Sequence, residues 1–384
     1  MADKQEFYVE LESIRGLMAW WVVCGHLYST FHQAIAPLPL IIEKFLLATA
    51  IPVDIFICLS GFFISKALDK NNSTYGPYII RRAFRIIPTY FFAMSLAIVF
   101  FDVRMSTRVD IPWSTAVQVA AVEDYWHGIA SSLTTYLLPC LVLLQGMIPD
   151  QLLPNSGSAF LAPAWSLTLE WQFYLIAPLL SSVFLFRWGK QLVVTVSLVS
   201  LLLLTSSGLT FSYGAFILVK LPVFILGMFT HNLFSNKRSK QKTVMMMLLV
   251  ALSVGLITMS FSSFISIALW CFFAISFSLR SKYKESLVLS LLNCCKLMLS
   301  NRVFIRLGVL SYSTYMIHIL VIDFILVAAK RVGFLHSDFV GLLIVLSVIV
   351  TYFVSVMMNR FIEVPFINYG KKIVSTVYSR EIKC

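Results

Sequence analysis

Residues 11–26, LESIRGLMAWWVVCGH, begin an apolar helix that carries an arginine near its start and a histidine deep inside. At about 100° per residue, Arg15, Ala19, Val22 and His26 fall on one stripe of that helix. At about 1.5 Å per residue, Arg15 and His26 lie roughly 16 Å apart along the axis. Insertion scales put the cost of Arg, Lys or Asp at the bilayer centre at about 2.5–3.5 kcal/mol. The stripe therefore predicts a helix that faces the inside of a membrane bundle, with His26 as a functional residue.

The composition supports a membrane protein. The chain has 384 residues, of which 59% are hydrophobic and 12% charged, with a mean hydropathy of +0.85. Soluble domains carry about 25% charged residues. Apolar runs of membrane-spanning length recur from one end to the other, which predicts an all-α polytopic protein and excludes a soluble domain with one anchor. The start, MADKQEFYVELE, lacks a cationic signal-peptide region, so we expect the first helix to stay in the protein.

The net charge of +12 and the seven cysteines exclude two other classes of function. In a membrane protein, lysine and arginine gather in cytoplasmic loops, so the charge predicts membrane lipids as partners and no nucleic acid. The cysteines show no CxxC pair and no metal-ligand spacing, which predicts neither a disulfide framework nor a metal site.

Hydropathy and loop charge together predict ten crossings with both termini in the cytoplasm. The crossings are expected at 14–34, 46–68, 80–101, 165–186, 191–208, 214–232, 244–261, 262–279, 306–329 and 339–362. The loop and tail cations are Lys66, Lys70, Arg81 and Arg82; Arg187 and Lys190; Lys237, Arg238, Lys240 and Lys242; Arg280, Lys282, Lys284, Lys296, Arg302 and Arg306; and Lys371, Lys372, Arg380 and Lys383.

The apolar stretch near 131–148 decides the topology. If it crossed, the basic loops after residue 186 would face outward, against the positive-inside rule. We therefore expect a re-entrant or in-plane segment there, which suits Pro139 in its middle. This scheme places Lys330 and Arg331 outside. It predicts one transmembrane domain over 1–370 and a short basic cytoplasmic tail over 371–384.

Polar residues inside the predicted spans mark a candidate site. Asp54 lies in the second span with Ser60 below it, where Ser60–Gly61 is also typical of small-residue helix packing. The third span opens with the cations Arg81, Arg82 and Arg85, which are equally typical of lipid anchoring and of a phosphate site.

Two later spans add polar faces. In the span at 165–186, Ser166, Glu170 and Tyr174 share a face. In the span at 306–329, Ser311, Tyr315 and His318 share one. The last span ends with Arg360 and Glu363, for which a surface ion pair or helix cap is as reasonable as catalysis.

Depth along the spans divides these residues into two groups. His26, Asp54, Glu170 and His318 are expected in the middle or outer half of the membrane. The inner face is expected to hold Arg15, Arg81, Arg82, Arg85 and Glu363. This layout suits a ligand whose phosphates stay on the cytoplasmic side while its reactive end reaches a base.

Six motifs in register carry a family resemblance. They are RGLMAWWVVCGH, VDIFICLSGFFI, RRAFRIIPTYF, WSLTLEWQFYLIAP, LGVLSYSTYMIHI and FIEVPF. In this order they resemble the membrane acyltransferase-3 family, which O-acylates bacterial surface sugars. One departure is Trp171 after Glu170, where the family often has a second acidic residue. No hydrolase-like domain follows the last span, so the membrane domain itself is expected to complete the transfer.

The resemblance implies a bacterial inner-membrane O-acyltransferase that uses acyl-CoA, usually acetyl-CoA, as co-substrate and no cofactor. The acceptor would be a hydroxyl of a surface glycan or lipid-linked sugar, such as O-antigen, capsule or exopolysaccharide. His26 is the expected base or acyl carrier, with Glu170 or Asp54 orienting it. The expected substrate-binding residues are Arg15, Arg81, Arg82, Arg85, Ser60, Tyr174, Tyr315, His318 and Glu363.

Two other classes of function remain open from the sequence. A glycan or lipid transporter would also bury charged residues. Against it, the sequence lacks the inverted repeat of broken helices that marks many transporters. A non-catalytic subunit of a polysaccharide assembly complex would tolerate changes at Arg15 and His26.

Overall fold

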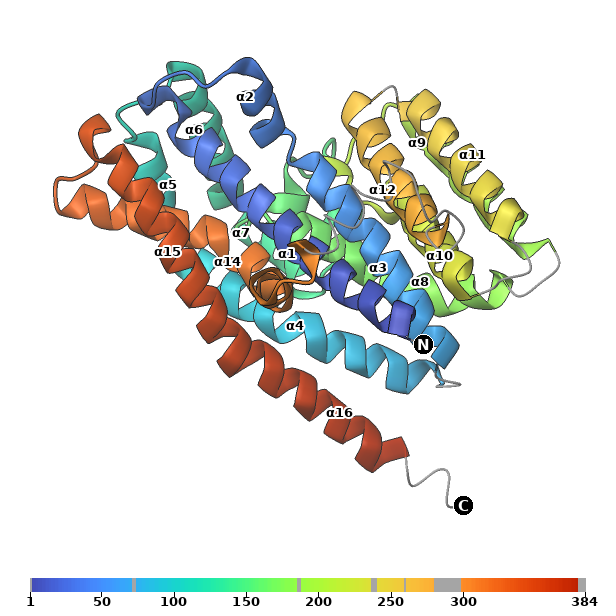
Figure 1. The fold of residues 1–384 in the computed structure, drawn as a ribbon. Coiled ribbons are helices and arrows are strands. Elements are labelled where there is room, and N and C mark those ends of the chain that lie inside the picture. The colour runs from blue at the N-terminus through green and yellow to red at the C-terminus, as the bar shows by residue number, and fades with distance from the viewer. Residues whose placement is uncertain are drawn as a thin grey trace.

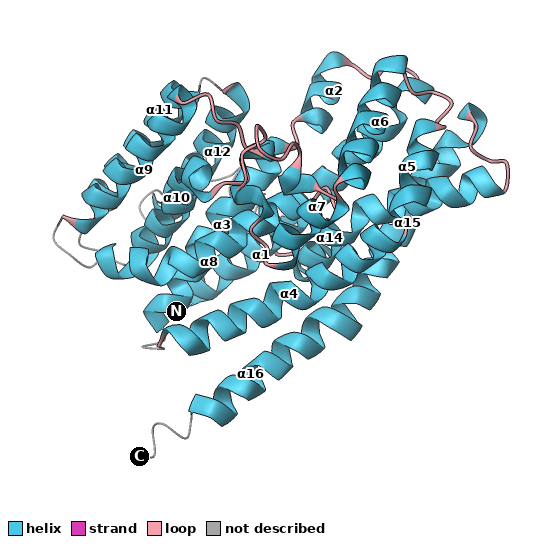
Figure 2. Cartoon of the chain, turned by 180° about the vertical axis from the view of Figure 1, so that it is seen from behind, coloured by secondary structure: helices cyan, strands magenta, loops and turns pink. Residues whose placement is uncertain are grey.

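A computed structural model describes residues 2–70, 74–184, 188–235, 240–258, 260–279 and 298–378, and these residues form helices and connecting turns without a strand (Figures 1 and 2). The helices are α1 (Ala2–Phe31), α2 (Leu40–Leu47), α3 (Ala50–Lys70), α4 (Tyr75–Val99), α5 (Phe101–Val109), α6 (Ala116–Ser131), α7 (Leu133–Leu141), α8 (Ala164–Phe184), α9 (Gly189–Ser206), α10 (Ile217–Ser235), α11 (Lys240–Thr258), α12 (Phe261–Leu279), α14 (Arg302–Arg331), α15 (Val340–Met358), a π-helical turn (Asn359–Glu363) and α16 (Val364–Tyr378). Several predicted loop cations lie outside the described residues: Arg187, Lys237, Arg238, Arg280, Lys282, Lys284, Lys296, Arg380 and Lys383.

Each of the ten predicted spans coincides with a helix, and the all-α polytopic fold is confirmed. In the part of the chain that the structure describes, eight helical stretches are long and apolar enough to cross a membrane. They contain α3, α4, α8, α9, α10, α11, α14 and the continuous run that includes α15 and α16. The other two predicted spans are α1 and α12, which are not among these eight.

Helices α1 and α14 run side by side and in the same direction through the middle of the bundle (Figure 1). Their close approach depends on Gly16 and Gly308. A methyl group at Gly16 would lie 2.5 Å from the backbone nitrogen of Gly308, so neither position has room for a side chain. Ten residues further along both helices, the rings of His26 and His318 lie 5.2 Å apart. The glycine contact therefore sets the register that brings the two imidazoles together.

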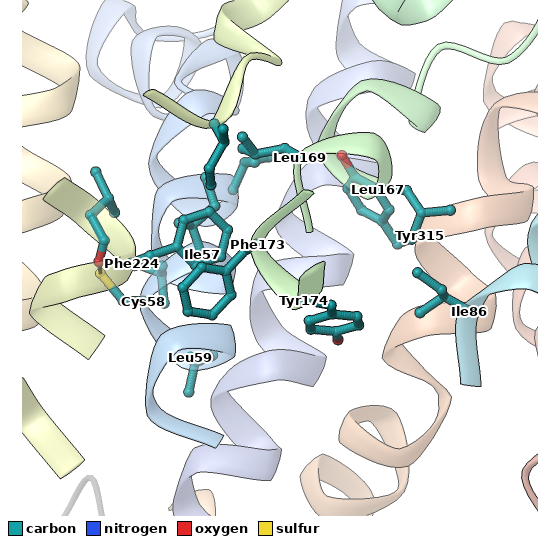
Figure 3. Packing of buried hydrophobic residues seen from close by; sticks show 14 of the residues in the cluster. Ile57, Cys58, Leu59, Ile86, Leu167, Leu169, Phe173, Tyr174, Phe224 and Tyr315 are labelled. Atoms are coloured by element: carbon teal, nitrogen blue, oxygen red, sulfur yellow. Dashed lines mark hydrogen bonds between the residues drawn. The ribbon is translucent and has the colours of Figure 1, made fainter. Parts of the chain in front are cut away.

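A second close contact joins α3 to α10 and forms one wall of the core. A side chain at Gly61 would clash with the backbone of Phe224, and one at Gly227 with the backbone of Cys58. Beside this contact, Phe173 of α8 stacks on Phe224 with ring centroids 4.0 Å apart (Figure 3). The small-residue packing expected at Ser60–Gly61 is thus confirmed for Gly61.

The stretch near 131–148 does not form a crossing helix, as expected. Its helix α7 has nine residues, or about 13.5 Å at 1.5 Å per residue, under half of a hydrocarbon core of about 30 Å. The segment is fixed to the bundle because the Tyr90 hydroxyl donates a hydrogen bond to the Cys140 carbonyl (2.9 Å) and the Thr168 hydroxyl donates one to the Leu143 carbonyl (2.6 Å). Helix α6 packs outside it as an additional helix that the hydropathy pattern did not predict.

Both chain termini lie at the same end of the bundle, which we call the terminal end (Figures 1 and 2). At this end the Tyr378 hydroxyl of α16 lies against Gly76 of α4. Helix α16 runs without a break through residue 370, so the predicted boundary between domain and tail falls inside it. Lys330 lies at the opposite end, where it forms an ion pair with Asp110.

Candidate active site

The polar stripe of α1 faces the interior of the bundle along its whole length. Ala19 and Val22 are 0% and 2% exposed, whereas Arg15 and His26 line cavities. At Gly16, next to Arg15, the backbone of α14 comes so close that a side chain would not fit. The arginine–glycine pair therefore has two physical tasks, since Gly16 admits the neighbouring helix and Arg15 projects into the space beside it.

Three cavities follow one another along this stripe. The first, which we call the cation cavity, lies toward the terminal end. It is lined by Glu12, Arg15, Ser60, Phe63, Ile64, Lys66, Ala67, Arg82, Arg85, Glu170 and Tyr174. Its lining thus contains four cationic and two anionic side chains, an excess of positive charge.

Aromatic rings hold the cations of this cavity in place. The Arg82 guanidinium lies 5.5 Å from the ring centre of Tyr174 and 5.8 Å from that of Tyr78. Arg15 lies 5.9 Å from the ring of Phe63 and 3.4 Å from the Glu12 carboxylate. Stacked guanidinium groups keep N–H donors available for a ligand, as phosphate recognition requires. Arg81 is not among the residues that line the cavity.

Glu170 lines the cation cavity and the middle cavity but not the histidine cavity, so it lies with the cations and away from His26. Its carboxylate accepts a hydrogen bond from Ser60 (2.8 Å) and a short one from Tyr174. Arg85 lies close enough to interact electrostatically with Glu170 and with Glu363.

The second cavity, which we call the middle cavity, lies next to the cation cavity. It shares Arg15, Ser60 and Glu170 with the cation cavity. Its other lining residues are Val53, Phe56, Ile57, Ser166, Leu167, Phe224, Ser311, Tyr312 and Tyr315, several of which appear in Figure 3. This mixture of apolar walls and a few hydroxyl groups suits an extended, weakly polar chain.

The third cavity, which we call the histidine cavity, shares Val53 and Tyr315 with the middle cavity. It is lined by Val22, His26, Thr49, Ala50, Val53, Ala162, Pro163, Trp165, Tyr213, Lys220, Tyr315 and His318. The three cavities therefore form a continuous series of shared walls from the cations to His26.

His318 is the polar neighbour of His26. Its Nδ1 lies 2.8 Å from the Tyr315 carbonyl oxygen; because a carbonyl only accepts, Nδ1 carries the proton. Its Nε2 is then the ring's acceptor, and it is buried with no hydrogen-bond partner among the described residues. The pair offers an available lone pair beside His26.

The two carboxylates expected to orient His26 are bound elsewhere. Asp54 accepts hydrogen bonds from Lys220 (2.7 Å) and Ser266 (2.9 Å), and Glu170 is bound as described above. Among the hydrogen bonds of the described residues, neither carboxylate contacts the His26 ring.

Buried ion pairs near His26 were missed by the sequence analysis. Asp323 is 1% exposed and binds Arg104 and Arg108, each through two nitrogens at 2.6–2.7 Å. Lys220 is the other charge that was missed. Asp323 and Lys220 are single charges inside predicted spans, where a charge is costly in lipid, so both were recognisable from the sequence in the same way as Asp54.

Glu363 is buried at the junction of α15 and α16. It accepts hydrogen bonds from Ser313 (2.7 Å) and Asn359 (2.9 Å). Arg360 is exposed and lies against the Phe361 ring. The surface ion pair weighed for Arg360 and Glu363 is therefore not formed.

The arrangement has parts that acyl transfer needs. A positive cavity can hold phosphates, a middle cavity with mostly apolar walls lies beside it, and an imidazole in the next cavity can move a proton. Among the described residues, no group of three or more histidine, cysteine, aspartate or glutamate side chains has the geometry to hold a metal ion.

Comparison with known proteins identifies the family. Residues 8–359 match the model of the acyltransferase-3 family, described as an acyltransferase domain. No curated protein and no solved structure matched the chain. The match covers α1 through the start of the π-helical turn and so contains all three cavities. The chain is therefore a membrane protein that belongs to the acyltransferase-3 family.

Proposed function

We propose that this protein is an integral-membrane O-acyltransferase that moves an acyl group, acetyl in the first instance, from acyl-CoA to a hydroxyl of a cell-surface glycan. We place it in the bacterial inner membrane with both termini in the cytoplasm. The observation that carries the proposal is the series of cavities from the cation cavity to His26.

The cation cavity suits the phosphates of coenzyme A. Its excess of guanidinium and ammonium groups favours an anion, and arginine forks match phosphate oxygens. The roughly 16 Å between Arg15 and His26 along α1 is comparable to an extended pantetheine arm. Acyl-CoA bound with its phosphates at the terminal end would bring its thioester to His26 through the middle cavity.

His26 is the proposed catalyst. As a base it takes the proton of the acceptor hydroxyl, whose oxygen attacks the thioester carbonyl. The C–S bond then breaks, and the coenzyme A thiolate leaves and recovers the proton from the imidazolium. As an alternative, His26 itself carries the acyl group between the two substrates. In either case the neighbouring His318 Nε2 is placed to accept a proton or hydrogen bond from the His26 side.

The direct test is transfer of label. Membranes that contain the protein are incubated with [14C]acetyl-CoA and with surface glycan from a strain that lacks the gene, and the glycan is analysed by mass spectrometry. We expect radioactivity and the mass of one acetyl group per modified sugar to appear together in the glycan. Export of glycan without label would support a transporter and overturn the proposal. Equal labelling with and without the protein would support a non-catalytic subunit.

A further inference from the structure

The histidine cavity ends on a pair of aromatic rings that the proposed proton transfer does not use. Trp165 at the start of α8 and Tyr213 before α10 both line the cavity. Their rings are offset-stacked, with centroids 5.6 Å apart and an angle of 25° between planes. Tyr213 is 65% exposed, so it presents an open aromatic face. This face lies on the side of His26 away from the cation cavity.

The backbone holds Tyr213 in a conformation that side chains rarely adopt. Its φ of 56° is left-handed, and Gly214 follows with a φ of 73°. The loop that carries it is fixed by a hydrogen bond from the Asp150 amide to the Thr210 carbonyl (2.8 Å) and by one from Ser212 to the Asp150 carboxylate. Strained residues held by well-bonded surroundings concentrate at ligand sites. The well-bonded loop therefore holds the exposed Tyr213 ring in one position, as a ligand-binding side chain requires.

A charged donor lies beside the rings. The Lys220 stem passes close to Gly214, where an added methyl group would be 3.4 Å from Lys220 Cε. Its ammonium group binds Asp54 at 2.7 Å, but an ammonium group has three donors. Because Asp54 compensates its charge, Lys220 is suited to hydroxyl groups more than to an anion. A purely apolar ligand in the histidine cavity would leave the remaining N–H donors of Lys220 without a hydrogen bond to the ligand.

We infer that the histidine cavity is the acceptor subsite and that it takes a pyranose ring of the glycan. The C–H face of the ring lies on the face of Tyr213 that is turned away from Trp165, its hydroxyl edge meets Lys220, and one hydroxyl points to His26. A pyranose has one apolar face and a polar rim, which matches an aromatic platform beside a hydrogen-bond donor. The inference rests on the proposed function, because it names where that reaction's acceptor binds.

The test uses the purified full-length protein in detergent with methyl α-D-mannopyranoside and methyl β-D-galactopyranoside as probes. Saturation-transfer NMR reports contact between protein and sugar C–H protons, and dialysis against [14C]acetyl-CoA reports donor binding. The variants are Tyr213→Asn, which removes the ring but tolerates a left-handed φ, and Tyr213→Phe, which keeps the ring. Phe353→Leu, at an exposed position of α15 outside the cavity linings, is the control for loss of an aromatic ring.

We expect sugar saturation in the wild type, in Tyr213→Phe and in Phe353→Leu, and a signal at least fivefold weaker in Tyr213→Asn, with unchanged acetyl-CoA binding. No saturation of either sugar in the wild type, equal signals in the wild type and Tyr213→Asn, or a parallel loss of acetyl-CoA binding would overturn the subsite. Transfer assays on the same variants separate the two claims. Tyr213-dependent sugar contact without acyl transfer counts against the proposed function alone, and transfer that ignores Tyr213→Asn counts against the subsite alone.

Discussion

The cation cavity and the histidine cavity lie along the same stripe of α1 but differ in how their charges are balanced. The cation cavity has four positive and two negative side chains in its wall. In the histidine cavity the one lysine, Lys220, is bound to Asp54, and the nearby Asp323 is bound to two arginines. An excess of unbalanced guanidinium groups favours an anion, whereas charges paired with each other organise their surroundings. This difference supports the cation cavity, at the terminal end, as the binding site of the proposed acyl-CoA donor.

Replacing His26 with alanine should have the largest effect, because His26 lines the histidine cavity and is the proposed catalyst. We expect acyl transfer to fall by about 10²–10⁴-fold, the usual contribution of a positioned acid or base, with normal membrane insertion. The measurement is transfer of [14C]acetyl groups to glycan by membranes that contain equal amounts of protein. His336→Ala, which changes an exposed histidine paired with Asp338, is the matched control. Near-normal transfer by His26→Ala would show that His26 is not the catalyst and would leave the histidine cavity without a role in acyl transfer.

The ion pair of the histidine cavity should be structural, and a double-mutant cycle tests this. Asp54→Asn or Lys220→Met alone leaves one buried charge without its partner, which costs about 3–5 kcal/mol in comparable cases. The double variant should recover part of this loss, because no charge is then unpaired. The free energy of unfolding in detergent is the measurement.

The exposed pair Lys330–Asp110 at the same end of the bundle supplies the control for this cycle. Its side chains are 40% and 54% exposed, so Lys330→Met should cost about 0–1 kcal/mol. Single changes at Asp54 and Lys220 as mild as Lys330→Met would show that this ion pair has no structural role. The paired charges of the histidine cavity would then not differ in their role from the unpaired charges of the cation cavity.

The sequence predicted which residues form helices better than it predicted which side chains contact each other between helices. Each long apolar run became a helix, because in lipid the backbone must satisfy its hydrogen bonds within a segment. The stripe of α1 faces the interior as predicted, since helical periodicity alone places Arg15 and His26 on the same side as the buried Ala19 and Val22. Partners across helices depend on register, which single-residue contacts such as Gly16 with Gly308 determine. For this reason His318 beside His26, and Lys220 beside Asp54, were not predicted as pairs.

Arg85 and Arg81 give the finest test of the comparison, because they lie one turn apart on α4 and only Arg85 lines the cation cavity. Arg85→Gln should raise the KM for acetyl-CoA about 10–100-fold, since one hydrogen bond to a charged group contributes about 1.5–3 kcal/mol, and the effect should shrink at high salt. Arg81→Gln, with the same loss of charge, should leave this KM within about twofold. Steady-state kinetics at two salt concentrations measure both. Equal effects of the two changes would mean that the cations act as a diffuse positive surface, as expected for lipid anchoring. The cation cavity would then no longer differ from the histidine cavity as a binding site for the donor.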